Sequence, residues 1–88
     1  MPAVSVTVPP SITGPEQQLE VSCEAATVGE ALRAVAARAP RYAQRLFFRD
    51  RLLVSVLVNG VVVPPAGALD TTLTEGDRVE VMAPVAGG

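Results

Sequence analysis

Short runs in which every second residue is apolar constrain the fold of this chain more than any other feature. Valine alternates with small or polar residues in Ala3-Val4-Ser5-Val6-Thr7-Val8, and Leu19-Glu20-Val21-Ser22-Cys23 repeats the pattern. A period of two is typical of strands that bury one face and expose the other. Pro9-Pro10 directly follows the first run, so we expect a loop there and an antiparallel hairpin made by the two strands.

A capping box marks the start of a helix after this hairpin. In Thr27-Val28-Gly29-Glu30 the Thr27 hydroxyl can accept from the backbone N–H of Glu30, and the Glu30 carboxylate can reach back to Thr27. Pro40 ends the helix, and residues 41–48 are expected to add a short further turn. The apolar residues at helical spacing, which predict one buried face, are Val28, Leu32, Val35, Ala36 and Ala39.

The second half of the chain has the pattern of further strands. Residues 53–58 form one apolar run, and Asn59-Gly60 separates it from Val61-Val62-Val63. Asn-Gly favours a type I′ turn because both residues tolerate positive φ, which predicts a second hairpin. A last strand is expected over residues 78–82. The order β-β-α-β-β-β is an α+β plan: a mixed sheet of about five strands with one main helix packed on one face.

The composition limits the chemistry that the side chains can perform. The chain has 88 residues, which suggests one domain. Tyr42, Phe47 and Phe48 are its only aromatic residues although 49% of the chain is hydrophobic, so the core should be aliphatic. Histidine is absent and Cys23 is the single cysteine, which excludes His-based catalysis, a His/Cys zinc site and an internal disulfide. We therefore expect no bound metal, no bound cofactor and no enzymatic activity.

Charge and hydropathy point away from membranes and nucleic acids. No apolar run is long enough to span a bilayer, and the N-terminus lacks the basic flank of a signal peptide, so a cytoplasmic protein is expected. The net charge is −2, and all seven basic residues are arginine. The six within residues 33–51 suit a solvated helix face, or a contact with an acidic partner. Without lysine or interleaved aromatic residues, we expect no nucleic-acid site.

The sequence ends in Ala83-Pro84-Val85-Ala86-Gly87-Gly88, and we expect residues 83–88 to be a flexible tail beyond a domain of residues 1–82. Glycine has no Cβ atom, so a Gly-Gly tail can enter a narrow tunnel and present its carboxylate. The alternative is a frayed terminus without function. Together with Val58-Asn59-Gly60 and Leu73-Thr74-Glu75-Gly76-Asp77-Arg78-Val79, this tail resembles that of the ubiquitin-like, or β-grasp, sulfur carrier family.

The resemblance spans the whole chain and implies the β-grasp fold. The family includes the thiamine sulfur carrier, the small subunit of molybdopterin synthase and the cysteine-biosynthesis sulfur carrier. The Pro-rich loop after the first strand and the Arg-rich link before the third are most similar to the last of these, or to a relative recruited to make a sulfur-containing natural product.

The resemblance also implies a chemistry for the tail. A ubiquitin-activating-like enzyme would use ATP to adenylate the Gly88 carboxylate, and a sulfur donor would displace AMP to leave a thiocarboxylate. That sulfur would then pass to a sulfur-accepting biosynthetic enzyme. Gly88 would hold the reactive group and Gly87 would give the tail clearance, while Val85 and Ala86 would contact the walls of the partner's tunnel. The chain itself would be a protein cosubstrate.

Two other functions fit the same tail. A ubiquitin-like modifier would use the activated carboxylate to form amide bonds with target lysines, and a small subunit of molybdopterin synthase would stay bound to one large subunit. A plain interaction domain with an irrelevant tail is the third alternative. The sulfur acceptor stays open among cysteine, molybdopterin, thiamine and a specialised metabolite.

Leu57 and Met82 are the candidate partner-binding residues. If the valines of the third and last strands face the helix, these two side chains face away from it, beside the small residues Ala3, Ser5 and Thr7. By analogy with ubiquitin-like proteins, this face would dock the activating enzyme of a carrier that is monomeric when free. Isolated apolar residues are also ordinary on protein surfaces.

Overall fold

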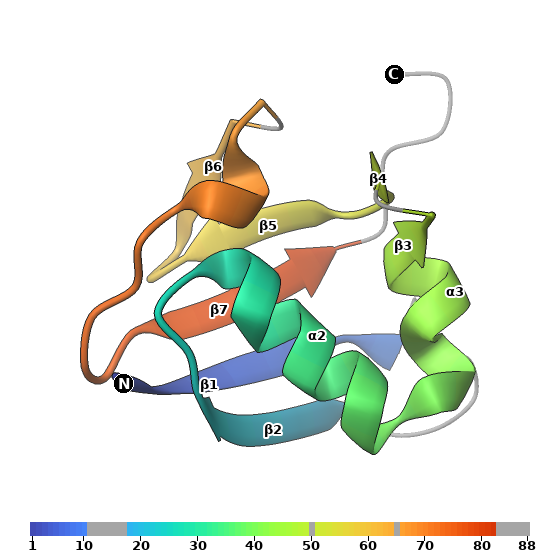
Figure 1. Cartoon of the computed structure of the whole chain (residues 1–88), viewed down its shortest axis with the longest axis horizontal. Coiled ribbons are helices and arrows are strands. Elements are labelled where there is room, and N and C mark those ends of the chain that lie inside the picture. The colour runs from blue at the N-terminus through green and yellow to red at the C-terminus, as the bar shows by residue number, and fades with distance from the viewer. Residues whose placement is uncertain (11–17, 50, 65, 83–88) are drawn as a thin grey trace.

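A computed structural model describes residues 1–10, 18–49, 51–64 and 66–82. Within these residues a five-stranded sheet carries a helix on one face (Figure 1). The sheet has the strand order β2-β1-β7-β5-β6. Its strands are β1 (Ala3–Val8), β2 (Leu19–Glu24), β5 (Ser55–Val58), β6 (Val61–Val63) and β7 (Arg78–Met82). The expected α+β fold with a mixed sheet is therefore confirmed.

The central strand of the sheet, β7, is parallel to its neighbour β1. β1 pairs antiparallel with β2, as the alternating pattern predicted, and β7 pairs antiparallel with β5 on its other side. β5 and β6 form the second hairpin. Its turn has positive φ at Asn59 (52°) and Gly60 (83°), the signs that a type I′ turn requires.

The main helix, α2 (Val28–Arg38), begins at the predicted cap. The Glu30 amide donates to Thr27 Oγ1 at 3.2 Å, as expected. The return bond differs from the prediction, because Glu30 Oε1 accepts from the amide of Ala26 at 2.9 Å rather than from Thr27. The Thr27 backbone is extended, as is usual for a residue that caps a helix. Gly29 and Ala31 are buried with the predicted residues Val28, Leu32 and Val35.

Residues 40–52 add more structure than the sequence predicted. The expected further turn is present as a 3-10 helix, η1 (Pro40–Tyr42), followed by α3 (Ala43–Leu46). A small hairpin of β3 (Phe47–Phe48) and β4 (Arg51–Leu52) then follows, which was not predicted. As a result β5 begins at Ser55 rather than at Leu53, because the Leu53 amide donates to Leu46 O at 2.9 Å and does not join the main sheet.

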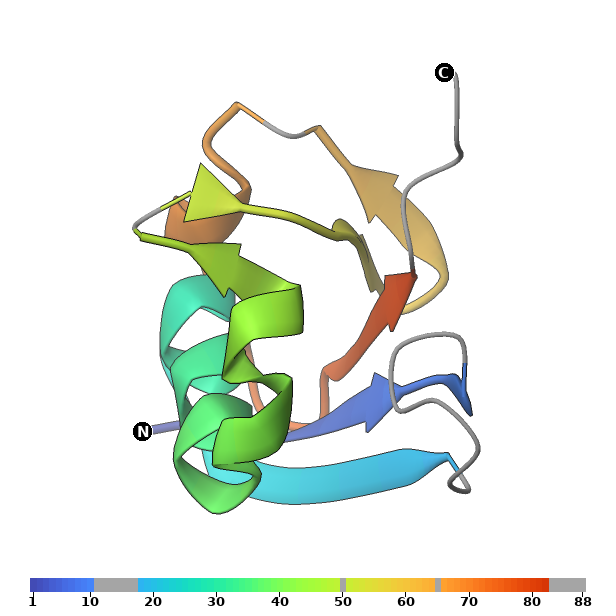
Figure 2. The same cartoon turned by 90° about the vertical axis from the view of Figure 1, so that its right-hand side faces the viewer.

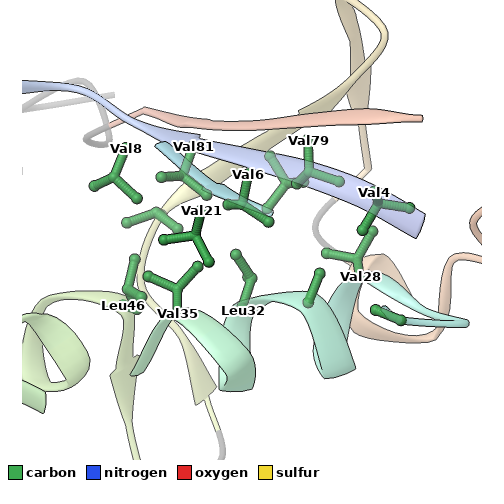
Figure 3. Packing of buried hydrophobic residues seen from close by; sticks show 14 of the residues in the cluster. Val4, Val6, Val8, Val21, Val28, Leu32, Val35, Leu46, Val79 and Val81 are labelled. Carbon is green, nitrogen blue, oxygen red and sulfur yellow. The ribbon is translucent and has the colours of Figure 1, made fainter. Parts of the chain in front are cut away.

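The core lies between α2 and the inner face of the sheet and is aliphatic, as expected. Alternate valines of the strands point toward the helix, where Leu32 and Val35 meet them (Figure 3). A second 3-10 helix, η2 (Ala68–Asp70), closes one end of this layer, with Ala68 and Leu73 buried. In the part of the chain that the structure describes, no helix is long and apolar enough to cross a bilayer.

Candidate functional site

The tail residues singled out from the sequence, Val85, Ala86, Gly87 and Gly88, lie outside the described residues. The structure does describe the strand that leads to them. β7 lies inside the sheet, with β1 on one side and β5 on the other, and its last residue is Met82 (Figure 2). β1 pairs with residues 78–80 of β7, and β5 pairs with residues 79–82, so the pairing with β5 continues to the last residue of the strand.

The start of β7 is tied to the β5–β6 turn by the Asn59 side chain. Asn59 Oδ1 accepts from the amide of Arg78 at 2.9 Å, and Asn59 Nδ2 donates to Asp77 Oδ1 at 2.9 Å. The Asn59 amide also donates to Arg78 O at 2.8 Å. Asn59 thus contributes its side chain to β7 as well as the positive φ of the turn, and only the second role was evident from the sequence.

Asp77 closes the turn before β7 with its carboxylate. Asp77 Oδ2 accepts from the amide of Thr74 at 2.8 Å. This hydrogen bond, together with that from Asn59, lowers the pKa of the Asp77 carboxyl below its ordinary value because both favour the charged form. The same turn also holds the start of β1, since the amide of Ala3 donates to Glu75 Oε1 at 2.8 Å.

The face of the sheet away from α2 carries an apolar patch made of Leu57, Val62 and Met82. Leu57 lies opposite Val62 on β6, and Met82 lies opposite Ser55 on β5. Met82 is 52% exposed and Val62 is 64% exposed, while Leu57 is half-buried. The predicted orientation of Leu57 and Met82 is confirmed, whereas their binding of a partner stays a prediction.

Val62 was missed in the sequence although the signal for it was present. The Asn-Gly turn fixes the pairing register of the hairpin, and that register places Val62 directly across from Leu57 on the same face. One charged side chain lies next to this patch, since Glu80 of β7 pairs with Leu57 on one side and with Thr7 of β1 on the other.

Cys23 lies on the helix-facing side of β2, opposite Val4, as its place in the alternating run predicted. It is half-buried at the edge of the core rather than fully enclosed. Burial raises the pKa of the Cys23 thiol, and the nearby Arg38 partly offsets this. A raised pKa keeps the thiol protonated and makes Cys23 a poor nucleophile.

Comparison with known proteins relates this arrangement to a family. The sequence matches the ThiS family over residues 8–88. A protein of Archaeoglobus fulgidus designated a candidate sulfur carrier is 32% identical over 89 residues, covering 98% of this chain and 99% of the relative.

Solved structures with the same fold extend the comparison. A chain of the Amycolatopsis orientalis BexX/CysO complex is 32% identical with a TM-score of 0.73, covering 98% of this chain and 100% of that one. SAMP1 from Haloferax volcanii is 27% identical with a TM-score of 0.71, covering 98% of this chain and 99% of that one.

Proposed function

The chain belongs to the ThiS family of ubiquitin-like sulfur carriers, and from this premise we propose that it carries sulfur as a thiocarboxylate on Gly88. The observation that carries the proposal is the family match over residues 8–88, which includes β2, α2, the later strands of the sheet and the Gly87-Gly88 tail. The chain is then a substrate of its partner enzymes, and its own side chains perform no chemistry.

The proposed reaction has two steps at the Gly88 carboxylate. One carboxylate oxygen attacks the α-phosphorus of ATP in an activating enzyme and displaces pyrophosphate, giving an acyl-adenylate. A sulfur donor at the oxidation level of sulfide then attacks the acyl carbon, expels AMP and releases a proton, giving the thiocarboxylate. AMP is needed as a leaving group because a free carboxylate is a poor electrophile. The carrier itself contributes only the position of the reacting atom.

The geometry of β7 supports this role. Strands on both sides hold β7 in the sheet, so a partner that grips the domain also fixes the point from which residues 83–88 leave. We propose that Gly87 gives clearance in the partner's tunnel and that Val85 and Ala86 contact its walls.

The apolar patch of Leu57, Val62 and Met82 is the proposed docking surface for the activating enzyme. It lies on the same sheet as the base of the tail, and Met82 belongs to both. Methionine adapts its shape to different partners, which suits a carrier that must meet one enzyme for activation and another for delivery.

We propose a separate biosynthetic enzyme as the sulfur acceptor, for cysteine or another sulfur-containing product. The likeness to a chain of the BexX/CysO complex supports delivery inside a complex of two proteins. The likeness to SAMP1, the small archaeal modifier protein 1 of Haloferax volcanii, favours protein modification as the second candidate function.

Intact-protein mass spectrometry tests the carrier chemistry. The chain is incubated with ATP, sulfide and an activating enzyme of the same organism, and we expect a mass increase that matches the exchange of one oxygen for sulfur. Fragmentation should locate the change at Gly88, and a variant without Gly88 is the matched control. No increase, with the enzyme shown to be active on another carrier, would contradict the proposal.

A second readout separates the two candidate functions. A modifier should form covalent adducts with lysines of other proteins when the same reaction is run in cell lysate. A carrier should instead accumulate the thiocarboxylate without such adducts.

A further inference from the structure

Strand β2 forms one edge of the sheet, and in the described part of the chain it has a neighbour on one side only. Its pairing with β1 shows which of its backbone groups face outward. The amide of Ser5 donates to Asp77 O and the amide of Gly76 donates to Ala3 O, so residues 3 and 5 of β1 turn their backbone toward β7. In an antiparallel ladder their partners on β2 then turn outward as well. The partners of Ala3 and Ser5 are Glu24 and Ser22, and the next outward residue two positions along β2 is Glu20, opposite Thr7.

A groove runs along the helix-facing side of this edge. One hollow of about 430 Å³ lies between the first half of β2 and the end of α2, with Leu19, Val21, Arg38 and Arg41 in its walls. A second, wider hollow reaches from Ser22, Cys23 and Glu24 across β1 to the turn of residues 75–77, and Arg38 belongs to its wall too. The first hollow gives room, between β2 and α2, for side chains of an extended chain laid against the first half of β2.

The two sides of the β2 edge carry opposite charge. On the helix-facing side the groove is bordered by Arg38 and Arg41, both exposed. On the open face Glu20 and Glu24 are exposed beside the outward backbone groups. The basic side belongs to a wider pattern, since residues 33–51 hold six of the seven arginines of the chain.

This charge pattern disfavours a second copy of the chain as the occupant of the edge. Two β2 strands paired antiparallel about Ser22 would place Glu20 of each copy opposite Glu24 of the other. Like charges directly opposite one another destabilise a strand pair. A partner strand with basic or small polar residues on that side would instead complement the two glutamates.

We propose that the β2 edge is a second docking site, which takes an extended segment of a partner protein as an additional antiparallel or parallel strand. In that segment the side chains that point toward the groove are apolar, apart from one acidic side chain that contacts Arg38. The side chains on the other face of the segment are basic, or small and polar. Backbone hydrogen bonds to Glu20, Ser22 and Glu24 supply affinity, and the groove and the charges supply selectivity. The site leaves Leu57 and Met82 uncovered, because β1 and β7 lie between β2 and β5.

The test uses the full chain and a short synthetic peptide in which valine alternates with lysine and one central valine is replaced by aspartate. NMR titration at physiological salt should shift the resonances of β2 and of the end of α2. Amide hydrogen exchange should slow at Glu20, Ser22 and Glu24, whose N–H groups face outward. The slowed exchange distinguishes strand addition from loose electrostatic attraction.

Two arginines of the same helix provide a matched pair of variants. Arg38→Glu should weaken peptide binding by about tenfold or more, because it places a like charge beside the peptide's aspartate. Arg33→Glu makes the same change of charge elsewhere on α2, because the Arg33 guanidinium lies next to Gly29. This variant should leave peptide binding unchanged. Ser22→Pro removes an outward donor without removing a β1–β2 hydrogen bond, so it should also weaken binding while circular dichroism shows a folded domain.

Several results would overturn the proposal. These are an absence of binding at millimolar peptide, equal losses in Arg38→Glu and Arg33→Glu, resonance shifts at Leu57 and Met82 in place of β2, and dimerisation of the chain through β2. None of these measurements involves Gly88, so failure here is distinguishable from failure of the sulfur chemistry.

Discussion

Leu57 is half-buried although its side chain lies on the face of the sheet that α2 does not cover. Its neighbours across the ladder, Val62 and Glu80, shield part of it. A side chain in this setting contributes little to the core, so its main energetic effect should appear when a partner covers it. Apolar residues at the centre of a contact surface often contribute most of the binding energy.

Replacing Leu57 with glutamate tests this at the scale of one residue. We expect Leu57→Glu to slow adenylation of the tail by about tenfold, or about 1.4 kcal/mol, because the activating enzyme would have to bury a charge. ATP–pyrophosphate exchange at limiting carrier concentration measures the effect. Thermal unfolding should change little.

Val61→Glu is the matched control for this experiment. Val61 is 69% exposed and lies next to Val62, but its position in the ladder, opposite Val58, puts it on the other face. The control should therefore support adenylation at the normal rate. Equal rates for Leu57→Glu and the wild-type chain would show that the patch is not the docking surface.

At the scale of elements, the turn before β7 joins three parts of the fold. The carboxylate of Asp77 accepts from Thr74 and Asn59, and its backbone carbonyl accepts from Ser5 of β1. Gly76 has a φ of 85°, which glycine adopts without strain. The β5–β6 hairpin, β1 and β7 are thus connected through one short segment.

The lowered pKa of Asp77 predicts a specific dependence of stability on pH. Because the folded pKa lies below the unfolded value of about 3.9, the stabilisation is complete above that value and is lost as pH falls through the folded pKa. Asp77→Asn should therefore lower the Tm by a few degrees at pH 7. The difference from wild type should shrink as the pH drops below about 4.

Differential scanning calorimetry between neutral and acid pH would measure this trend. Asp70→Asn removes an equal charge from η2 and serves as the control, with little expected change in Tm. A difference between Asp77→Asn and the wild-type chain that stays constant down to the lowest pH would contradict the role given to the carboxylate.

Elements that depend on local chemistry could be predicted from the sequence. The capping box at Thr27, the type I′ turn at Asn59-Gly60 and the alternating strands all rely on residues close together in the chain. The β3–β4 hairpin could not, since two-residue strands are too short to show a period. Its place depends on the contact between Leu53 and Leu46, which the preceding helical turn creates.

At the scale of the molecule, one thin aliphatic core holds the sheet to α2. Leu32 is among its largest fully buried side chains. Truncating such a residue removes buried apolar surface and leaves a cavity, which costs about 2–5 kcal/mol. That is a large part of the roughly 5–15 kcal/mol that stabilises a typical domain.

Leu32→Ala should therefore lower the free energy of unfolding by about 2–5 kcal/mol in urea denaturation. Arg33→Ala, at an exposed position of the same helix, should change it by less than about 0.5 kcal/mol. Equal effects of the two changes would mean that α2 does not pack on the sheet as the structure has it.

The strand order is the property of the whole molecule that local patterns could not supply. Alternation shows that residues 78–82 form a strand, but their place between β1 and β5 depends on contacts between distant parts of the chain. The resemblance carried by the turn and tail motifs supplied the β-grasp arrangement instead. The candidate site divides in the same way: the outward direction of Leu57 and Met82 followed from periodicity, and that of Val62 could have been read from the Asn-Gly turn, while the side-chain role of Asn59 required its contact with the distant start of β7.

The position of β7 has a consequence for how the protein is made on the ribosome. β7 is the last described element to be synthesised, yet it occupies a central place in the sheet. Until it emerges, the β1–β2 and β5–β6 hairpins have no strand to join them, and pairs so distant in sequence form slowly. A nascent chain therefore completes its sheet only when the strand that bears the tail is inserted. Completion of the sheet and synthesis of the C-terminal residues therefore fall together, and a chain truncated before β7 would offer a partner neither a finished surface nor the Gly-Gly end.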